Sequence, residues 1–336
     1  MGNSIHVNLN GIGFNVGCDT TESLKKVKYV FDNMFVPGYD NTAPTLCDFN
    51  IYFSNDPIKY SKLTESLMDF NAQKFNPNIY KYLYNGIDIY HHYSGFYVYG
   101  LDDCYYIISN DSKYAPYHLI LELYLRVCEE NGIYIFHGNG IKMDDNGINI
   151  IGHSHSGKTT LMSKLFQIDG VDKAFLSNDR VLIGSDKTLY FPLEINLDRN
   201  TISNDQNLLG KIDNNNPKIY VKPKTFVSCY PDLRYVDNIR NNCFLIPRID
   251  LKSTMRINVK EVGREEAISA LEESCFSIVD RECKRDNWIK EEDLPKKVEG
   301  VTSLLSTLTE QYRFLSVEYG CDLRGEKIYE KIRKKD

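Results

Sequence analysis

The sequence has a single tryptophan, no long apolar run and no closely spaced pair of cysteines. Among 336 residues, Trp288 is the one tryptophan. No apolar run approaches the ~18 residues that a membrane-spanning helix needs, so we expect no membrane association. The first residues also lack a charged segment followed by an apolar one, so we expect no secretory signal.

The cysteines exclude two classes of site. There are nine of them, widely spaced and without any CxxC or CxxxxC pair, which argues against zinc-knuckle and redox motifs. Scattered cysteines without a secretory signal favour reduced thiols in a cytoplasmic protein.

The sequence also has no large excess of either positive or negative charge. Lys and Arg number 40 and Asp and Glu number 46, a net charge of −6, so we expect no nucleic-acid partner of the kind that binds a basic field. Hydrophobic residues at 42% and charged residues at 26% are typical of globular proteins. At ~100–200 residues per domain, the length predicts two domains.

The sequence pattern of the first part of the chain predicts a smaller α+β domain over residues 1–112. Apolar residues at helical spacing predict a helix over 23–35, and the Asn85-Gly86 dipeptide is typical of a two-residue hairpin turn. Aromatic residues alternate between Tyr80 and Tyr106. This alternation favours a sheet face packed on a core over a base-stacking platform, because no arginines are interleaved.

The second domain is predicted over residues 113–336. A strong helix pattern covers 115–131 and ends before Gly132, and strands and helices alternate from there to about residue 320, which indicates an α/β fold. The Asn-rich stretch 203–224 interrupts this pattern and predicts a long mobile loop.

One motif indicates nucleotide binding. The segment GINIIGHSHSGKTTLMSKL (147–165) contains G-x-x-x-x-G-K-[ST] between an apolar strand and an amphipathic segment. Glycines allow backbone N–H groups to close around phosphate oxygens, and the helix that follows directs its positive end at the anion. Lys158 would supply charge to the β/γ-phosphates, and the Thr159 hydroxyl would bind Mg²⁺.

The motif therefore predicts a bound nucleotide with Mg²⁺, and it does not by itself distinguish ATP from GTP. The two histidines of the loop occupy variable positions, which leaves open whether they contact phosphate or face solvent. The predicted nucleotide-binding residues are Gly152, His153, Ser154, His155, Ser156, Gly157, Lys158, Thr159 and Thr160.

A magnesium–triphosphate site usually has a further acidic residue at the end of a neighbouring strand. In KAFLSNDRVLIG (173–184), Asp179 follows a short apolar run. Glu194, in YFPLEINLD, is a second candidate. The predicted metal ligands are thus Thr159, Asp179 and Glu194, with an ordinary turn carboxylate as the alternative for each acid.

Taken in order, these segments resemble the HPr serine kinase/phosphorylase family and related bacterial kinases. Phe136-His137-Gly138 is similar to its His-Gly element, GHSHSGKTTL to its phosphate loop, and LSNDRVLI to its paired-acid segment. PLEINLD resembles the segment with its Leu-Glu-Ile motif. The segment CFLIPRIDLKSTMRINVKEVGREEAISALEESCF and the closing FLSVEYG (314–320) are similar to its late elements. The resemblance covers about residues 115–320.

The resemblance implies a P-loop kinase core related to phosphoenolpyruvate carboxykinase, which transfers the γ-phosphoryl group of ATP to a serine hydroxyl. It implies that Asp179 is the general base, that Thr159 and Glu194 bind Mg²⁺, and that His137 lies beside the acceptor. The family commonly has two adjacent aspartates, whereas here the first position is Asn178. An amide orients a hydroxyl but takes no proton, so Asp179 is the predicted base.

Several cations are candidates for neutralising charge on the transferred group. Lys158 and Arg248 complete the predicted catalytic set with Asp179 and His137, and Arg180 is a further candidate. A surface salt bridge is the alternative for either arginine. Lysines in the Asn-rich stretch would either close over a ligand or remain solvated, namely Lys218, Lys222 and Lys224.

The predicted function is an ATP-dependent kinase that phosphorylates a Ser/Thr hydroxyl of a peptide or protein, including a ribosomal peptide precursor. The alternatives are a kinase of a free amino acid or other small hydroxyl metabolite, and a non-catalytic nucleotide-sensing module, which Asn178 motivates. The 1–112 domain is a candidate for acceptor recognition. The resemblance also implies a homo-oligomer.

Overall fold

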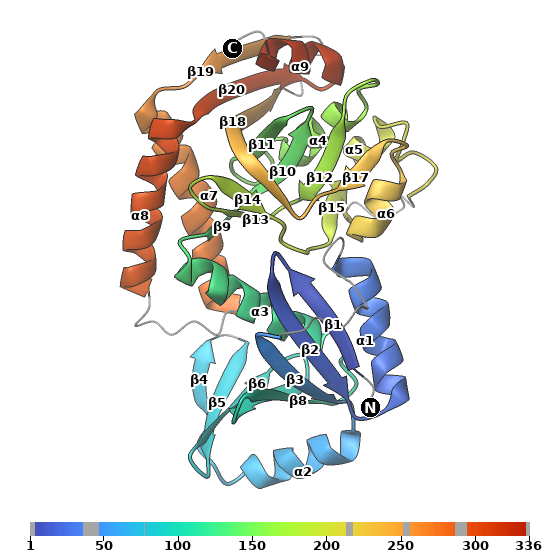
Figure 1. The fold of residues 1–336 in the computed structure, drawn as a ribbon, viewed down its shortest axis with the longest axis vertical. Coiled ribbons are helices and arrows are strands. Elements are labelled where there is room, and N and C mark those ends of the chain that lie inside the picture. The colour runs from blue at the N-terminus through green and yellow to red at the C-terminus, as the bar shows by residue number, and fades with distance from the viewer. Residues whose placement is uncertain are drawn as a thin grey trace. The chain divides into compact units, whose positions relative to one another are not determined.

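The computed structural model describes residues 4–35, 47–76, 78–212, 218–250, 256–285 and 294–333. In that part of the chain it is a mixed α/β protein with nine helices and several sheets (Figure 1). The chain forms two compact units, one from Met1–Val127 with Asp280–Leu294, the other from Cys128–Val279 with Pro295–Asp336. Trp288 lies outside the described residues.

An eight-stranded sheet forms the first unit. Its strands, in spatial order, are β1 (Ser4–Leu9), β2 (Ile12–Cys18), β3 (Phe49–Ser54), β8 (Cys104–Ser109), β7 (Phe96–Leu101), β6 (Ile87–His92), β5 (Ile79–Tyr84) and β4 (Gln73–Asn76). Three helices accompany the sheet, namely α1 (Thr21–Met34), α2 (Pro57–Leu67) and α3 (Ala115–Glu130).

The aromatic residues of β7 pack on both faces of the first sheet. Phe96 and Tyr97 are consecutive on β7 and therefore point to opposite faces. Phe96 stacks with His118 of α3, whereas Tyr97 packs against Tyr60 of α2. The two helices thus cover opposite faces, in agreement with the prediction that the aromatic alternation serves a packed core.

The structure divides the chain at Val127/Cys128, whereas the sequence pattern suggested 112/113. The difference is the helix α3. Its Tyr124 hydroxyl accepts a hydrogen bond of 2.8 Å from Asn10, and its Tyr117 ring packs against Phe35 of the first unit. Because α3 buries its apolar side chains on the first sheet, it belongs to that unit although it follows a polar linker.

The second unit contains a ten-stranded sheet. The strand that leads into the predicted phosphate loop, β11 (Asn146–Ile151), lies near its centre. Along the sheet lie β17 (Leu233–Tyr235), β12 (Lys173–Ser177), β10 (Gly138–Met143), β11 (Asn146–Ile151), β18 (Asn238–Asp250), β14 (Lys187–Leu189), β13 (Val181–Ile183) and β9 (Tyr134–Phe136). β20 (Arg313–Gly320) pairs with β18 and with β19 (Ile257–Glu261). β11, β18 and β20 are mutually parallel, so their carboxyl ends lie at one edge.

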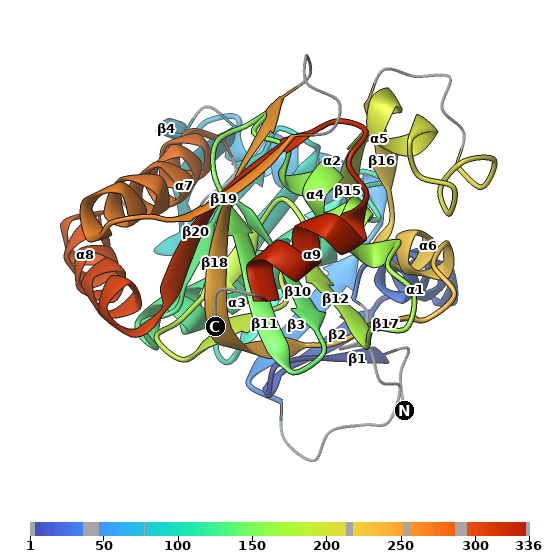
Figure 2. The ribbon, with the colours of Figure 1, turned by 90° about the horizontal axis from the view of Figure 1, so that it is seen from above.

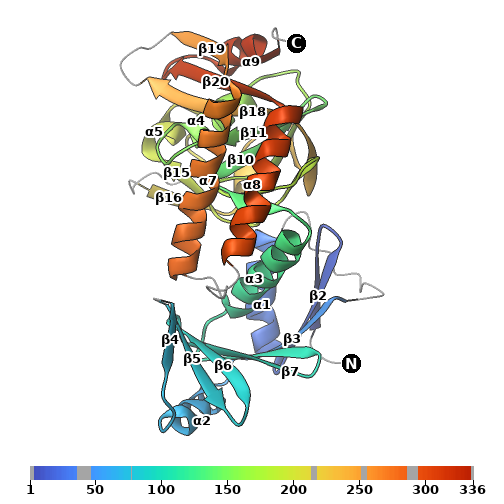
Figure 3. The ribbon, with the colours of Figure 1, turned by 90° about the vertical axis from the view of Figure 1, so that its left-hand side faces the viewer.

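Helices cover this sheet in two pairs. α4 (Lys158–Phe166) packs beside α9 (Gly325–Arg333) against a large buried apolar cluster (Figure 2). α7 (Arg264–Arg285) and α8 (Leu294–Gln311) lie side by side (Figure 3), where Arg264 bonds to Ser306 and Glu310. None of the described helices combines the length and apolar character that crossing a bilayer requires.

Part of the stretch 203–224, predicted as a long mobile loop, is regular structure, whereas residues 204–212 form turns. β15 (Ile195–Asp198) pairs with β16 (Lys218–Val221), and α5 (Arg199–Ser203) and α6 (Pro223–Ser228) flank them. The carboxylate of Asp205 is fully buried and accepts hydrogen bonds of 2.5 Å from both Ser163 and Tyr230. This buried acid fixes a stretch whose composition alone resembles a loop. Residues 213–217 lie outside the described part.

Other local predictions are confirmed. The predicted helix near 23–35 is α1, the 115–131 helix is α3, and Asn85 and Gly86 have φ values of 50° and 80° in the β5–β6 hairpin. The cysteines whose side chains are described are all free thiols.

A half-buried histidine in the first unit makes the stability of that unit depend on pH. Burial, and then the nearby charge of His92, lower the pKa of His91, which also bonds to the Tyr60 hydroxyl. Below a pH of about 6.5, the unfolded chain therefore binds more protons than the folded one, and the free energy of unfolding falls. We expect the melting temperature to drop from pH 7.5 to pH 5.5, by less in His91→Gln than in the wild type.

The matched control is His155→Gln, because the His155 side chain is exposed. Its melting temperature should fall by the same amount as that of the wild type over this pH range. Equal losses in the wild type and in His91→Gln would contradict the assignment of the pH dependence to His91.

Candidate functional site

The predicted phosphate loop connects β11 to the first turn of α4, at the edge where the parallel strands end. Gly157 is the N-cap of α4 with a φ of 97°, and no side chain caps this helix. A Cβ atom at this position would lie 2.6 Å from the Tyr319 hydroxyl and 3.0 Å from Ile249, so the loop is closely packed. Uncapped N–H groups at a helix start favour an anion.

Hydrogen bonds from three neighbouring elements hold the backbone of this loop. The Gly152 N–H donates to the Ser274 hydroxyl of α7 at 3.0 Å, and the Ile249 N–H of β18 donates to Ser156 O at 3.2 Å. The Tyr319 hydroxyl of β20 donates to Gly157 O at 2.8 Å. The loop conformation is therefore set by the tertiary structure before any ligand binds.

Lys158 lies within the loop. Its side chain is buried, and its ammonium donates to the carbonyls of Gly152 at 2.7 Å and His153 at 2.8 Å. These two bonds hold the positive charge of the ammonium inside the loop.

The hydroxyl of Thr159 contacts an amide and not an acid. It donates to Asn178 Oδ1 at 3.1 Å, and Asn178 is 2% exposed. The Nδ2 of Asn178 and the hydroxyl of Ser156 are buried without a hydrogen-bond partner in the described part of the chain. Buried polar atoms of this kind are costly unless a ligand or water satisfies them, so they fit a phosphate-bearing ligand in the loop.

Asp179 forms a pair with His137. The His137 Nε2 lies 3.2 Å from the Asp179 carboxylate, with His137 buried and Asp179 about half-exposed. Asp179 has a φ of 67°, a left-handed conformation, and its N–H donates to the buried Asn139 Oδ1 at 3.0 Å. A strained backbone that is held by its surroundings is common at functional sites.

The ionisation of Asp179 depends on its neighbours. Protein atoms packed around the carboxyl raise its pKa, but the hydrogen bond and charge of His137 oppose this effect. The positive charges of Arg180 and Lys158 act in the same direction, and the net pKa lies below the ordinary aspartate value. The carboxylate is therefore ionised at neutral pH and able to accept a hydrogen bond.

The remaining loop residues have varied surroundings. Thr160 bonds to the Thr201 hydroxyl at 3.0 Å, and His153 contacts the carboxylate of Glu273. Ser154 and His155 are exposed, and His155 has a φ of 66°.

The other predicted site residues are not assembled into a metal centre. Glu194 is half-buried just before β15, and the described residues contain no group of three or more His, Cys, Asp or Glu arranged to hold a metal ion. Arg248 is exposed on β18 and lies 3.6 Å from Glu266 of α7, so it is placed in a surface ion pair. The Lys218 side chain lies outside the described residues, and Lys222 and Lys224 flank the start of α6.

Three residues that position the site were missed by the sequence analysis. Asn139 holds Asp179, while Ser274 and Tyr319 hold the phosphate loop from distant segments. Asn139 alone leaves a signal, as a polar residue inside an apolar strand pattern. Nothing in the local sequence around Ser274 or Tyr319 marks them.

Comparison with protein-family models and with curated proteins found no match to this chain.

The close packing of Gly157 predicts a large effect of a single methyl group. Gly157→Ala should lower the free energy of unfolding by ~1–3 kcal/mol from overpacking, beyond the ~1–2 kcal/mol cost of a left-handed alanine. Gly170→Ala is the matched control, since Gly170 has a φ of 72° and a Cβ added there would have no atom within 4 Å. Urea unfolding followed by circular dichroism measures both.

The difference between the two variants isolates the contacts with Tyr319 and Ile249. Equal destabilisation of the two proteins would show that the loop accommodates the extra methyl group and is not tightly held.

Proposed function

We propose that this chain is an ATP-dependent phosphotransferase with a P-loop kinase core of the HPr kinase/phosphoenolpyruvate carboxykinase type. The support comes from the second unit, where a G-x-x-x-x-G-K-T loop joins a strand to an uncapped helix beside a paired Asp–His. The proposed acceptor is a Ser/Thr hydroxyl of a peptide or protein.

One observation carries this proposal. The consecutive residues Asn178 and Asp179 reach two different groups, since Asn178 bonds to Thr159 of the loop while Asp179 pairs with His137. The candidate base is therefore adjacent to the residue that contacts the predicted metal-binding hydroxyl. A kinase needs this neighbourhood, because the acceptor oxygen must approach the terminal phosphate of the bound nucleotide.

The residues divide the reaction between them. Asp179 accepts the proton of the acceptor hydroxyl. The oxygen of that hydroxyl bonds to the γ-phosphorus while the bond between this phosphorus and the leaving ADP oxygen breaks. His137 orients the Asp179 carboxylate and keeps it ionised. Lys158 and the N-terminus of α4 stabilise charge on the phosphate oxygens. Mg²⁺, when bound through Thr159 with Asn178 and Asp179 nearby, supplies further charge neutralisation to the triphosphate.

A nucleotide-sensing module without turnover is the second candidate, and Asn178 is the observation that favours it. A buried amide stands where the resembled kinases commonly have a first acid, and an amide binds Mg²⁺ without contributing charge. A kinase of a small hydroxyl metabolite shares the same core and differs in its acceptor.

Removal of the base separates binding from turnover. Asp179→Asn should keep Mg·ATP affinity within about 3-fold and lower phosphotransfer at least ~100-fold, since general-base catalysis typically contributes that much or more. Binding is measured by isothermal titration calorimetry. Turnover is measured with γ-labelled ATP and a cell extract, followed by separation of peptides from small molecules.

A second variant, Lys158→Ala, tests the phosphate loop and should weaken the binding of ATP. If the wild type and Asp179→Asn bind Mg·ATP equally and neither transfers phosphate nor hydrolyses ATP, the kinase proposal is wrong and the sensing module is favoured. Label in a small molecule would identify the metabolite kinase instead.

The His137–Asp179 pair predicts a shift in the pH profile. Because His137 lowers the Asp179 pKa, its replacement in His137→Gln should raise that pKa. The reactive carboxylate then protonates at a higher pH on acidification, so the acidic limb of kcat/KM should move to higher pH. The measurement is Mg²⁺-dependent ATP turnover between pH 4.5 and 8.

The control for this profile is Arg248→Gln, since Arg248 is exposed and pairs with Glu266 and not with Asp179. Its acidic limb should coincide with that of the wild type. An unshifted limb in His137→Gln would remove His137 from the proposed role.

A further inference from the structure

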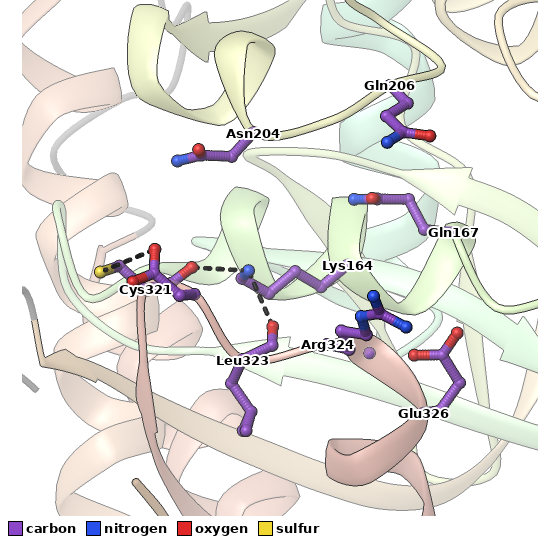
Figure 4. Close-up of a pocket in the computed structure, with 10 residues that line it drawn as sticks. Lys164, Gln167, Asn204, Gln206, Cys321, Leu323, Arg324 and Glu326 are labelled. Carbon is purple, nitrogen blue, oxygen red and sulfur yellow. Dashed lines mark hydrogen bonds between the residues drawn. The ribbon is translucent and has the colours of Figure 1, made fainter. Parts of the chain in front are cut away.

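A polar cavity of about 450 Å³ lies at the C-terminal end of α4 in the second unit. Figure 4 shows the side chains of Lys164 and Gln167 extending from this helix in the same direction. Asn204 and Gln206 form a second wall, and the turn from Cys321 to Glu326, at the start of α9, forms the third.

The cavity and the phosphate loop lie on the same face of α4, one toward each end of the helix. Thr160, Lys164 and Gln167 are spaced four and three residues apart, so they share that face. Two chain segments run beside it. One contacts Thr160 through Thr201 and lines the cavity from Asn204 onward. The other bonds to Gly157 through Tyr319 and lines the cavity from Cys321 onward.

The distance from the loop suits the nucleoside end of a nucleotide. Lys158 and Lys164 are six residues apart, which is ~9 Å along a helix at 1.5 Å per residue. The lysine side chain is directed back toward the helix N-terminus, which brings the cavity wall closer to the loop. A nucleoside attached to phosphates in the loop spans a distance of this order.

Lys164 makes the third wall rigid. The residue is 8% exposed, and its ammonium donates to Cys321 O at 2.7 Å and Leu323 O at 2.9 Å, as Figure 4 shows. A lysine buried among carbonyls fixes the turn that precedes α9. This wall is therefore formed in the absence of a ligand.

The lining chemistry excludes two ligand classes. Gln167, Asn204 and Gln206 supply amides, which an apolar ligand would leave unsatisfied. The carboxylates of Asp322 and Glu326 also line the cavity and would repel a bare anion.

A purine nucleoside matches this lining. Amide side chains pair with the N6 and N7 edge of adenine, and carboxylates accept hydrogen bonds from ribose hydroxyls. Arg324 is exposed and makes no hydrogen bond or ion pair within the described residues, so its guanidinium is available to stack on a base. The volume lies in the usual range of ligand pockets, about 300–1,000 Å³.

We propose that this cavity holds the adenosine half of ATP, with Gln167 and Arg324 as determinants of nucleoside affinity. The inference rests on the proposed function, because it requires that the loop binds the phosphates. It assigns recognition of the base to residues outside the phosphate-loop motif.

Two ligands separate the inference from the proposed function. The affinities of Mg·ATP and of inorganic tripolyphosphate are measured by isothermal titration calorimetry on the full chain. In a Gln167→Ala, Arg324→Ala double variant, the ATP affinity should fall ~10-fold or more, as expected from the loss of one or two ligand contacts, while tripolyphosphate affinity stays within about 2-fold. Lys158→Ala should weaken both ligands.

Lys327→Ala is the matched control, since Lys327 is exposed on α9 outside the cavity lining. It should leave both affinities unchanged. If the double variant binds ATP as the wild type does, or loses both ligands equally, the nucleoside assignment is overturned while the phosphate site stands. If the wild type binds neither ligand, the proposed function fails and the assignment fails with it.

Discussion

The hydrogen bond from the Asp179 N–H to the buried side chain of Asn139 places the polar groups of the candidate site. At 3.0 Å inside the protein, this bond holds Asp179 in a left-handed conformation that an isolated chain would rarely adopt. The resulting turn directs the carboxylate toward His137, while the preceding Asn178 reaches Thr159. A second bond, from the Gly138 N–H to Asp179 O at 3.2 Å, holds the same residue from the adjoining strand β10.

The phosphate loop depends on its backbone more than on its side chains. Ser274, Ile249 and Tyr319 come from three different elements, and each bonds to a peptide group of the loop. Gly157 is constrained twice, once by its positive φ and once by the side chains packed against it.

The first unit uses its aromatic residues for packing. Phe96 and Tyr97 point to opposite faces of the sheet, and each face is covered by a helix. On the face covered by α2, the His91 ring stacks with Tyr97. Apolar burial on both sides of one sheet therefore stabilises this unit. The division at Val127 follows from the same principle, since α3 belongs where its apolar side chains are buried.

Local patterns in the sequence determined the helices near 23–35 and 115–131, the Asn85-Gly86 turn and the strand–loop–helix around Lys158, because these depend on neighbours within a few residues. The tertiary structure alone decided that Asp179 meets His137, that Arg248 is placed with Glu266 on the surface, and that the 203–224 stretch is anchored by a buried Asp205. Those outcomes depend on which distant side chain occupies the space beside each group. No periodicity or spacing along the chain carries that information, because contacts between distant segments are selected by packing of the whole unit.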